Sequence, residues 1–106
     1  MVITRTLSQY QRVVAHLVMP EDRSDLEYSA IRLGGEAGEV LNQIAKHLRE
    51  LKYNVPVDTR MERIEEEIGD TLYCLARVCI ALELDFDLVG ERNLLKMKER
   101  KTNLTR

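Results

Sequence analysis

Residues 59–84 read TRMERIEEEIGDTLYCLARVCIALEL, an uninterrupted helical pattern that begins with acidic turns and ends almost without charge. Thr59 and Glu62 have the spacing of a capping box, which predicts the start of the helix. Beyond Thr71 only Arg77 and Glu83 carry charge, and a helix that is apolar nearly all round is usually buried on every side. The pattern therefore predicts a helix with two partner surfaces, and homo-oligomerisation supplies the second most simply.

Three more helices are predicted, over about residues 7–19, 25–53 and 86–101. No strand pattern interrupts the chain. In the first two, apolar residues recur at spacings of three and four, which is typical of amphipathic helices. The expected N-caps are Thr6, Ser24 and Asp85. Short loops between antiparallel helices make a bundle. We therefore expect one all-α domain over residues 1–106, a four-helix bundle that is oligomeric.

The composition is that of an ordinary globular protein, with 44% hydrophobic and 32% charged residues and a net charge of −2. With no Trp and one Phe there are few platforms for stacking nucleic-acid bases. No apolar run approaches the roughly 20 residues that span a membrane, and residues 1–5 lack a signal-peptide core. Cys74 and Cys79 lie five apart in one helix, so we expect them to be reduced. These features predict a cytoplasmic protein that binds neither membrane nor nucleic acid.

Two similar tetrapeptides carry the chemistry: Glu36-Ala-Gly-Glu39 and Glu67-Ile-Gly-Asp70. Residues three apart on a helix are neighbours, so each tetrapeptide offers a pair of carboxylates, and antiparallel packing can bring the pairs together. Two like charges 4 Å apart repel by about 4 kcal/mol at an effective dielectric of 20, a penalty that a cation removes. An all-carboxylate site without His or Cys favours Mg²⁺, or Mn²⁺, over Zn²⁺.

Four glycines beside these acidic pairs strengthen the interpretation: Gly34, Gly35, Gly38 and Gly69. Glycine inside a helix costs roughly 0.5–1 kcal/mol relative to alanine, and a close approach of helix or ligand would explain it. The alternative is a solvated acidic face, because a helical wheel puts Glu36 and Glu39 on the polar side of their helix.

At these residues the sequence resembles the MazG-like family of all-α NTP pyrophosphohydrolases. The family signature is Glu-x-x-Glu, a spacer, then Glu-x-x-Asp; the matching segments are Leu33-Gly-Gly-Glu-Ala-Gly-Glu-Val40 and Glu66-Glu-Ile-Gly-Asp-Thr-Leu-Tyr73. Tyr10-Gln11 is similar to the opening helix of the family, and residues 93–100 to its closing segment. Tyr73 and Cys74 depart from the pattern, because those positions are often Trp and another aromatic, which leaves the base preference open.

The resemblance implies hydrolysis at the α-phosphorus of a nucleoside triphosphate, which gives a nucleoside monophosphate and pyrophosphate. It implies that one or more Mg²⁺ ions are held by four carboxylates, one of which also takes a proton from water: Glu36, Glu39, Glu67 and Asp70. It also implies a homodimer or a tetramer built from two dimers.

Candidate phosphate ligands lie on the last helix, where Lys96 and Arg100 share one face and Asn93 precedes them by a turn. Their spacing alone equally fits a basic helix end that complements the helix dipole, whereas the resemblance favours substrate binding. Lys46, downstream of Glu39, is a further candidate.

Three other functions are compatible with parts of the pattern. A related hydrolase of phosphoribosyl-ATP or dUTP would share the signature. A non-catalytic helical module that binds a partner protein would keep the fold alone. A di-iron bundle needs Glu-x-x-His motifs, but Val13 and Ile44 stand three residues before His16 and His47, which argues against it.

Overall fold

Residues 6–104 are described by a computed structural model, and every regular element among them is helical. The elements are α1 Leu7–Leu17, a short 3₁₀ helix η1 Pro20–Asp22, α2 Leu26–Lys52, α3 Arg60–Leu82 and α4 Phe86–Leu104. The all-α class and the four helices predicted from the sequence are confirmed. Within this part of the chain no helix combines the length and the apolar character that a membrane crossing requires.

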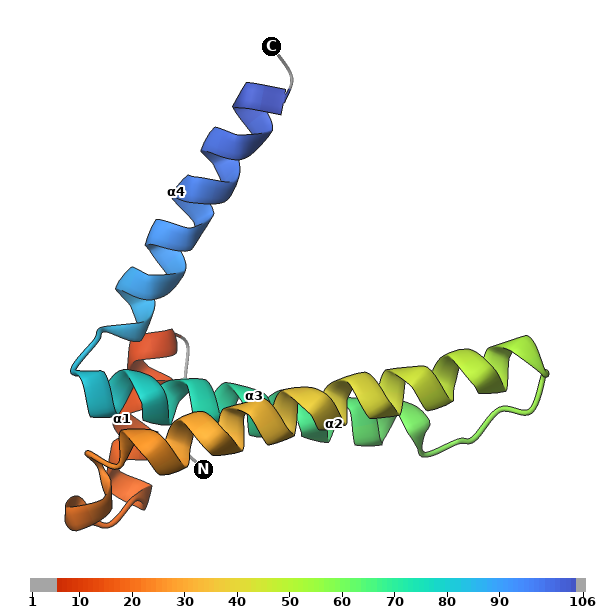
Figure 1. Cartoon of the computed structure of the whole chain (residues 1–106), viewed down its shortest axis with the longest axis horizontal. Helices are drawn as coiled ribbons and strands as arrows, with labels where there is room; N and C mark the ends of the chain where they lie inside the picture. Colours follow the sequence, from red (N-terminus) through yellow and green to blue (C-terminus); the bar gives the residue numbers. More distant parts are fainter. Residues whose placement is uncertain (1–5, 105–106) are drawn as a thin grey trace.

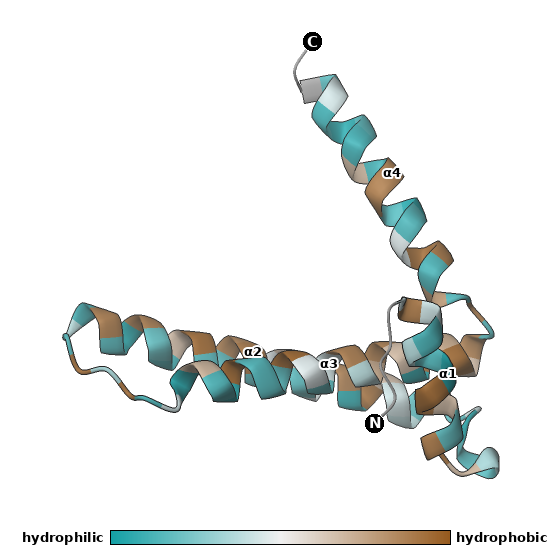
Figure 2. Ribbon diagram, turned by 180° about the vertical axis from the view of Figure 1, so that it is seen from behind, coloured by the Kyte–Doolittle hydropathy of each residue, from teal (hydrophilic) through white to brown (hydrophobic). Residues whose placement is uncertain are grey.

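The helices are arranged as a long antiparallel hairpin with two shorter arms at one end (Figure 1). α2 and α3 lie side by side, α1 packs across the C-terminal half of α3, and α4 starts from the same end (Figures 1 and 2). α4 contacts α1 and then points away from the hairpin. One chain therefore leaves its fourth helix apart from the other long helices.

Buried polar side chains hold the hairpin together near its loop. Arg60, the first residue of α3, is 7% exposed and donates hydrogen bonds to both carboxylate oxygens of Glu50, at 2.7–3.1 Å. The same guanidinium also donates to Gln43, which is buried on α2. A hydrogen bond from Arg60 lowers the pKa of Glu50 and keeps it ionised. These contacts fix how far α2 and α3 are shifted along each other.

The largest apolar cluster lies where α1, α3 and the start of α4 meet. Its buried members are Val14, Val18, Ala76, Cys79 and Phe86. Burying a side chain of the size of Val14, Val18 or Phe86 contributes about 1.5–3 kcal/mol. The sulfurs of Cys74 and Cys79 are both buried and form no disulfide, as the sequence predicted.

The capping predictions are confirmed in part. Thr6 forms the expected capping box, in which its hydroxyl accepts from the Gln9 amide and its own amide donates to the Gln9 side chain, both at 3.0 Å. The prediction of Ser24 was wrong: Asp25 caps α2, because the preceding 3₁₀ turn moves the helix start by one residue. Thr59 occupies the cap position of α3 without a capping hydrogen bond from its side chain.

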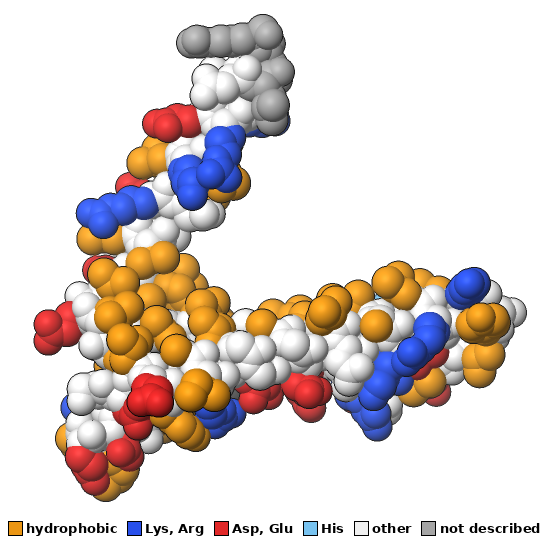
Figure 3. Space-filling model, viewed as in Figure 1, with side chains coloured by type: hydrophobic (Ala, Val, Ile, Leu, Met, Phe, Trp, Pro, Cys, Tyr) orange, Lys and Arg blue, Asp and Glu red, His pale blue; other side chains and the backbone are white. Residues whose placement is uncertain are grey.

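The apolar face of the amphipathic helix α2 is largely exposed in the single chain. Leu41 and Leu48 on α2 are 69% and 59% exposed. Apolar residues of α2 and α3 line a shallow groove of about 320 Å³: Ala37, Val40, Ile68, Leu72 and Leu75, with Thr71. Figure 3 shows hydrophobic side chains on the side of the hairpin that faces α4 and at their junction. The apolar face of this amphipathic helix is therefore not part of a core in the single chain, because α4 points away from the hairpin.

Hydrogen bonds between α1 and the start of α4 set the direction of α4. The Asp85 carboxylate accepts from the Ser8 hydroxyl and from the Asp87 amide, and so caps α4 as predicted. The Gln11 side chain donates to the Leu84 carbonyl at 2.7 Å and accepts from the Phe86 amide at 3.0 Å.

Asp85→Asn is expected to lower the melting temperature at neutral pH and to have little effect in acid. The hydrogen bond from Ser8 lowers the pKa of Asp85. A lowered pKa stabilises the fold above the ordinary carboxyl pKa, and that stabilisation is lost as the pH falls through the folded-state value. Thermal unfolding followed by circular dichroism at pH 7 and pH 3 measures the difference. Asp58→Asn, in an exposed loop, is the control; equal losses for Asp85→Asn at both pH values would contradict the assignment.

Candidate metal centre

Three carboxylates meet midway along the hairpin, where the two acidic tetrapeptides lie side by side. One oxygen each from Glu36 on α2 and Glu67 and Asp70 on α3 lie within 4.8 Å of one another. Figure 3 shows acidic side chains about midway along the hairpin, on its lower edge in that view. The antiparallel packing therefore brings together three of the four residues that the sequence singled out.

The closeness of like charges in the cluster raises the pKa of one member, Glu67, in addition to the effect of burial. Glu36 and Glu67 are half-buried, and Asp70 is exposed. Burial raises the pKa of Glu67, and a hydrogen bond with Glu36 and the charges of Glu36, Asp70 and Glu39 raise it further. A bound cation would relieve this repulsion.

Glu39 lies outside this group of three oxygens, although its charge still acts on Glu67. Three residues of α-helix turn the chain by about 300°, so Glu39 is rotated about 60° from the direction of Glu36. Since Glu36 faces α3, Glu39 is left exposed at the edge of the cluster.

Arg32 is a member of the site that the sequence analysis missed. Its guanidinium forms an ion pair with Glu36 at 3.1 Å and donates to the Tyr28 hydroxyl at 3.4 Å. It also lies 5.9 Å from the centre of the Tyr28 ring, a cation–π distance. These contacts raise the pKa of Arg32 and orient Glu36. The available signal was the spacing of four between residues 28, 32 and 36, which puts them on one helix face.

The oxygen atoms fit a hard divalent cation. Carboxylates are the ligands that Mg²⁺, Mn²⁺ and Ca²⁺ prefer. Opposite ligands of Mg²⁺ lie about 4.2 Å apart, so a spread of 4.8 Å requires only a small rotation of the side chains.

The comparison with known protein families identifies the family of the chain. A family model described as the MazG nucleotide pyrophosphohydrolase domain matches residues 14–105, which include all three carboxylates. The chain belongs to this family. The resemblance recognised from the two tetrapeptides is therefore confirmed.

A curated relative extends the comparison of this MazG domain. The chain is 34% identical over 76 residues to the Gene 37 protein of Mycobacterium phage L5. The match covers 72% of this chain and 66% of the phage protein, just under two thirds of its length. The name of this relative states no activity. No solved structure matches the chain.

The predicted phosphate ligands lie away from the carboxylates within one chain. Lys46 is half-buried and lines a separate hollow of about 280 Å³ near the hairpin loop, beside Arg49 and Tyr53. Asn93, Lys96 and Arg100 are exposed on α4, which points away from the hairpin.

The four glycines beside the acidic pairs are not explained by packing within the chain. A Cβ atom built at Gly34, Gly35, Gly38 or Gly69 meets nothing within 4 Å outside the adjoining turns of its own helix. The close helix–helix approach expected there is therefore absent between α2 and α3.

Glu67→Gln is expected to weaken Mn²⁺ binding at least about tenfold, because a direct ligand matters no less than the outer-shell partners whose loss costs 10–100-fold. Electron paramagnetic resonance of free Mn²⁺ measures the affinity without any turnover. Glu65→Gln is the matched control on the exposed side of the same helix. Equal affinities for wild type and Glu67→Gln would remove Glu67 from the metal centre.

Proposed function

We propose that this chain is a Mg²⁺-dependent nucleoside triphosphate pyrophosphohydrolase, which converts an NTP and water into an NMP and pyrophosphate. The observation that carries the proposal is the convergence of Glu36, Glu67 and Asp70, in a chain whose family is named for that chemistry. Mn²⁺ is the alternative ion with the same preference for oxygen ligands.

In this mechanism Glu36, Glu67 and Asp70 would hold the metal, and Glu39 would add a fourth negative charge at the edge of the cluster. Bound Mg²⁺ supplies charge neutralisation for the triphosphate and lowers the pKa of water. Arg32 keeps Glu36 turned towards α3. A carboxylate of the cluster takes the proton from the water that attacks the α-phosphorus.

The other candidates differ in how well they fit the cluster. A partner-binding module gives no reason to crowd three carboxylates within 4.8 Å, and dUTP or phosphoribosyl-ATP hydrolysis would use the same cluster on a narrower substrate. We propose a cytoplasmic enzyme, which agrees with two buried cysteines that form no disulfide.

Asp70→Asn is expected to lower pyrophosphate release from NTPs at least about 100-fold, because the substitution removes a charged ligand without changing the volume of the side chain. A screen over canonical and modified NTPs with Mg²⁺ and Mn²⁺ first identifies the substrate. Circular dichroism confirms that the helices persist, and Asp58→Asn is the control. Asp70→Asn at the wild-type rate would refute the proposed function.

We further propose that the active form is a homodimer, or a tetramer of two dimers, in which α4 of one copy reaches the carboxylates of another. α4 lies apart from the carboxylates of its own chain. The apolar groove between α2 and α3 lies open, and on α4 the residues Asn93, Met97 and Arg100 recur at spacings of four and three along one face. A second copy would cover this apolar surface.

Co-expression of two defective chains tests this arrangement. Asp70→Asn and the double variant Lys96→Ala/Arg100→Ala, given different tags, form mixed dimers. If α4 acts on the neighbouring copy, one site in each mixed dimer is intact, and equal mixing restores about a quarter of wild-type activity at low substrate. Activity no higher than the mean of the two parents would show that α4 does not act between copies.

A further inference from the structure

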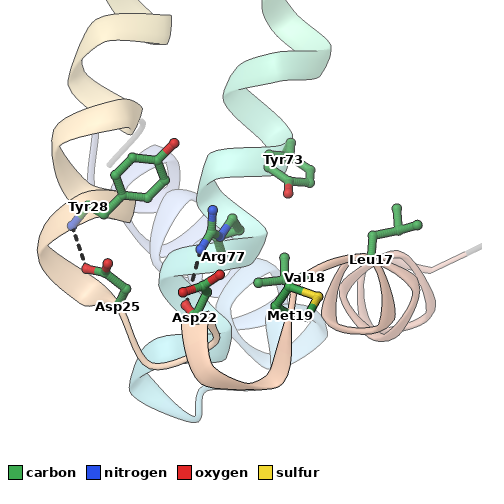
Figure 4. A pocket seen from close by; sticks show the side chains of 8 residues that line it. All are labelled: Leu17, Val18, Met19, Asp22, Asp25, Tyr28, Tyr73 and Arg77. Atoms are coloured by element: carbon green, nitrogen blue, oxygen red, sulfur yellow. Dashed lines mark hydrogen bonds between the residues drawn. The ribbon is translucent and has the colours of Figure 1, made fainter.

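A cavity of about 420 Å³ lies at the end of the hairpin where α1, η1, α2 and α3 converge (Figure 4). Its volume is within the range of about 300–1,000 Å³ typical of small-molecule sites. Tyr28, Tyr73 and Arg77 line one side, and Asp22 and Met19 the other (Figure 4). Neither the metal centre nor the helix packing uses this space.

The cavity begins about one helical turn beyond the metal centre along α3, where Tyr73 follows Asp70 by three residues. Tyr28 contacts Arg32, and Arg32 pairs with Glu36 of the cluster. On α3, Tyr73 and Arg77 follow Asp70 by three and seven residues, so they lie on the same side, roughly 5 Å and 10 Å further along the axis. Burial raises the pKa of the Cys74 thiol, and charges from both places act on it as well: Arg32 and Arg77 lower this pKa, whereas Glu36 and Asp70 raise it. A ligand with phosphates on the cluster can therefore extend into this cavity.

The apolar part of the lining suits a flat ring. Leu17 and Met19 are 73% and 60% exposed although they lie next to the apolar core. The half-buried Tyr73 also lines the cavity (Figure 4). A heteroaromatic base placed between these side chains would remove exposed apolar surface from water.

The polar part of the lining offers one acceptor beside one donor. Within residues 6–104 no hydrogen bond or ion pair to the Asp22 carboxylate is found, although the carbonyl of Asp22 accepts from Arg77 at 3.2 Å. The Arg77 guanidinium also lies 5.3 Å from the centre of the Tyr28 ring. Since a guanidinium carries five N–H donors, several of them stay available to a ligand. Asp25 also lines the cavity, but its carboxylate caps α2.

We propose that this cavity binds the base of the nucleotide and selects cytosine or guanine over uracil, thymine and adenine. Asp22 accepts from the exocyclic amino group, and Arg77 donates to the ring carbonyl. Uracil and thymine present carbonyl oxygens where Asp22 needs a donor, and adenine has no carbonyl for Arg77. The inference rests on the proposed function, because the cluster supplies the anchor for the phosphates.

Calorimetric titration of the four ribonucleoside 5′-monophosphates CMP, GMP, AMP and UMP, without divalent ions, tests the inference. The wild-type chain is expected to bind CMP or GMP at least about tenfold more tightly than UMP, as one hydrogen bond to a charged group allows. Asp22→Asn should reduce this ratio to about threefold or less, because an amide can also donate to uracil. Glu21→Gln is the control, an exposed acidic neighbour in η1 that does not line the cavity.

Arg77→Gln provides an independent variant and should weaken CMP and GMP without weakening AMP. Equal binding of all four monophosphates, or a ratio that Asp22→Asn and Arg77→Gln leave unchanged, overturns the inference. Pyrophosphate release measured in parallel distinguishes a failure of the base-binding inference from a failure of the proposed function. Turnover without base preference refutes only the assignment of the cavity to the base. Base preference without turnover supports base binding in the cavity and refutes the proposed enzymatic function.

Discussion

The antiparallel register of α2 and α3 is the constraint on which the metal centre depends. A shift of one residue moves a helix by about 1.5 Å and turns its side chains by about 100°, which would separate Glu36 from Glu67. Arg60 prevents such a shift, because its guanidinium is buried and bonded to Glu50 and Gln43 across the two helices. Leaving a buried charge without these partners is strongly unfavourable. A polar contact near the loop thus protects the geometry of a site farther along the hairpin.

The single chain has more apolar surface than its own fold can cover. One apolar cluster joins α1, α3 and the start of α4, while Leu41, Leu48 and other residues of the hairpin stay in contact with solvent. Ser8 and Gln11 hold the first turn of α4 at an angle that keeps this helix away from the hairpin. The arrangement that exposes the groove between α2 and α3 also exposes the basic residues of α4. Both features fit an active site that a second copy completes.

The charges and the cavity along one side of the hairpin suggest how a nucleotide substrate would be oriented. In the proposed arrangement the carboxylates would bind the cation; Arg32 links Glu36 to Tyr28, and Arg77 and Asp22 line the cavity beyond. Phosphates would lie on the cluster and the base in the cavity. The departure from tryptophan at Tyr73 falls at the boundary between the two, where it affects the shape of the cavity and leaves the cation ligands unchanged.

Features that depend on neighbours along the chain could be predicted from the sequence: four helices, the caps at Thr6 and Asp85, and two carboxylate pairs. Backbone hydrogen bonds and side chains three or four residues apart decide these. Three features became visible only once the helices were placed in space: Glu39 lies at the edge of the cluster, α4 points away from the hairpin, and Arg77 donates to the carbonyl of Asp22. These features depend on the rotation and register of the helices and on contacts between residues far apart in the sequence. The periodicity of apolar residues along the sequence does not specify them.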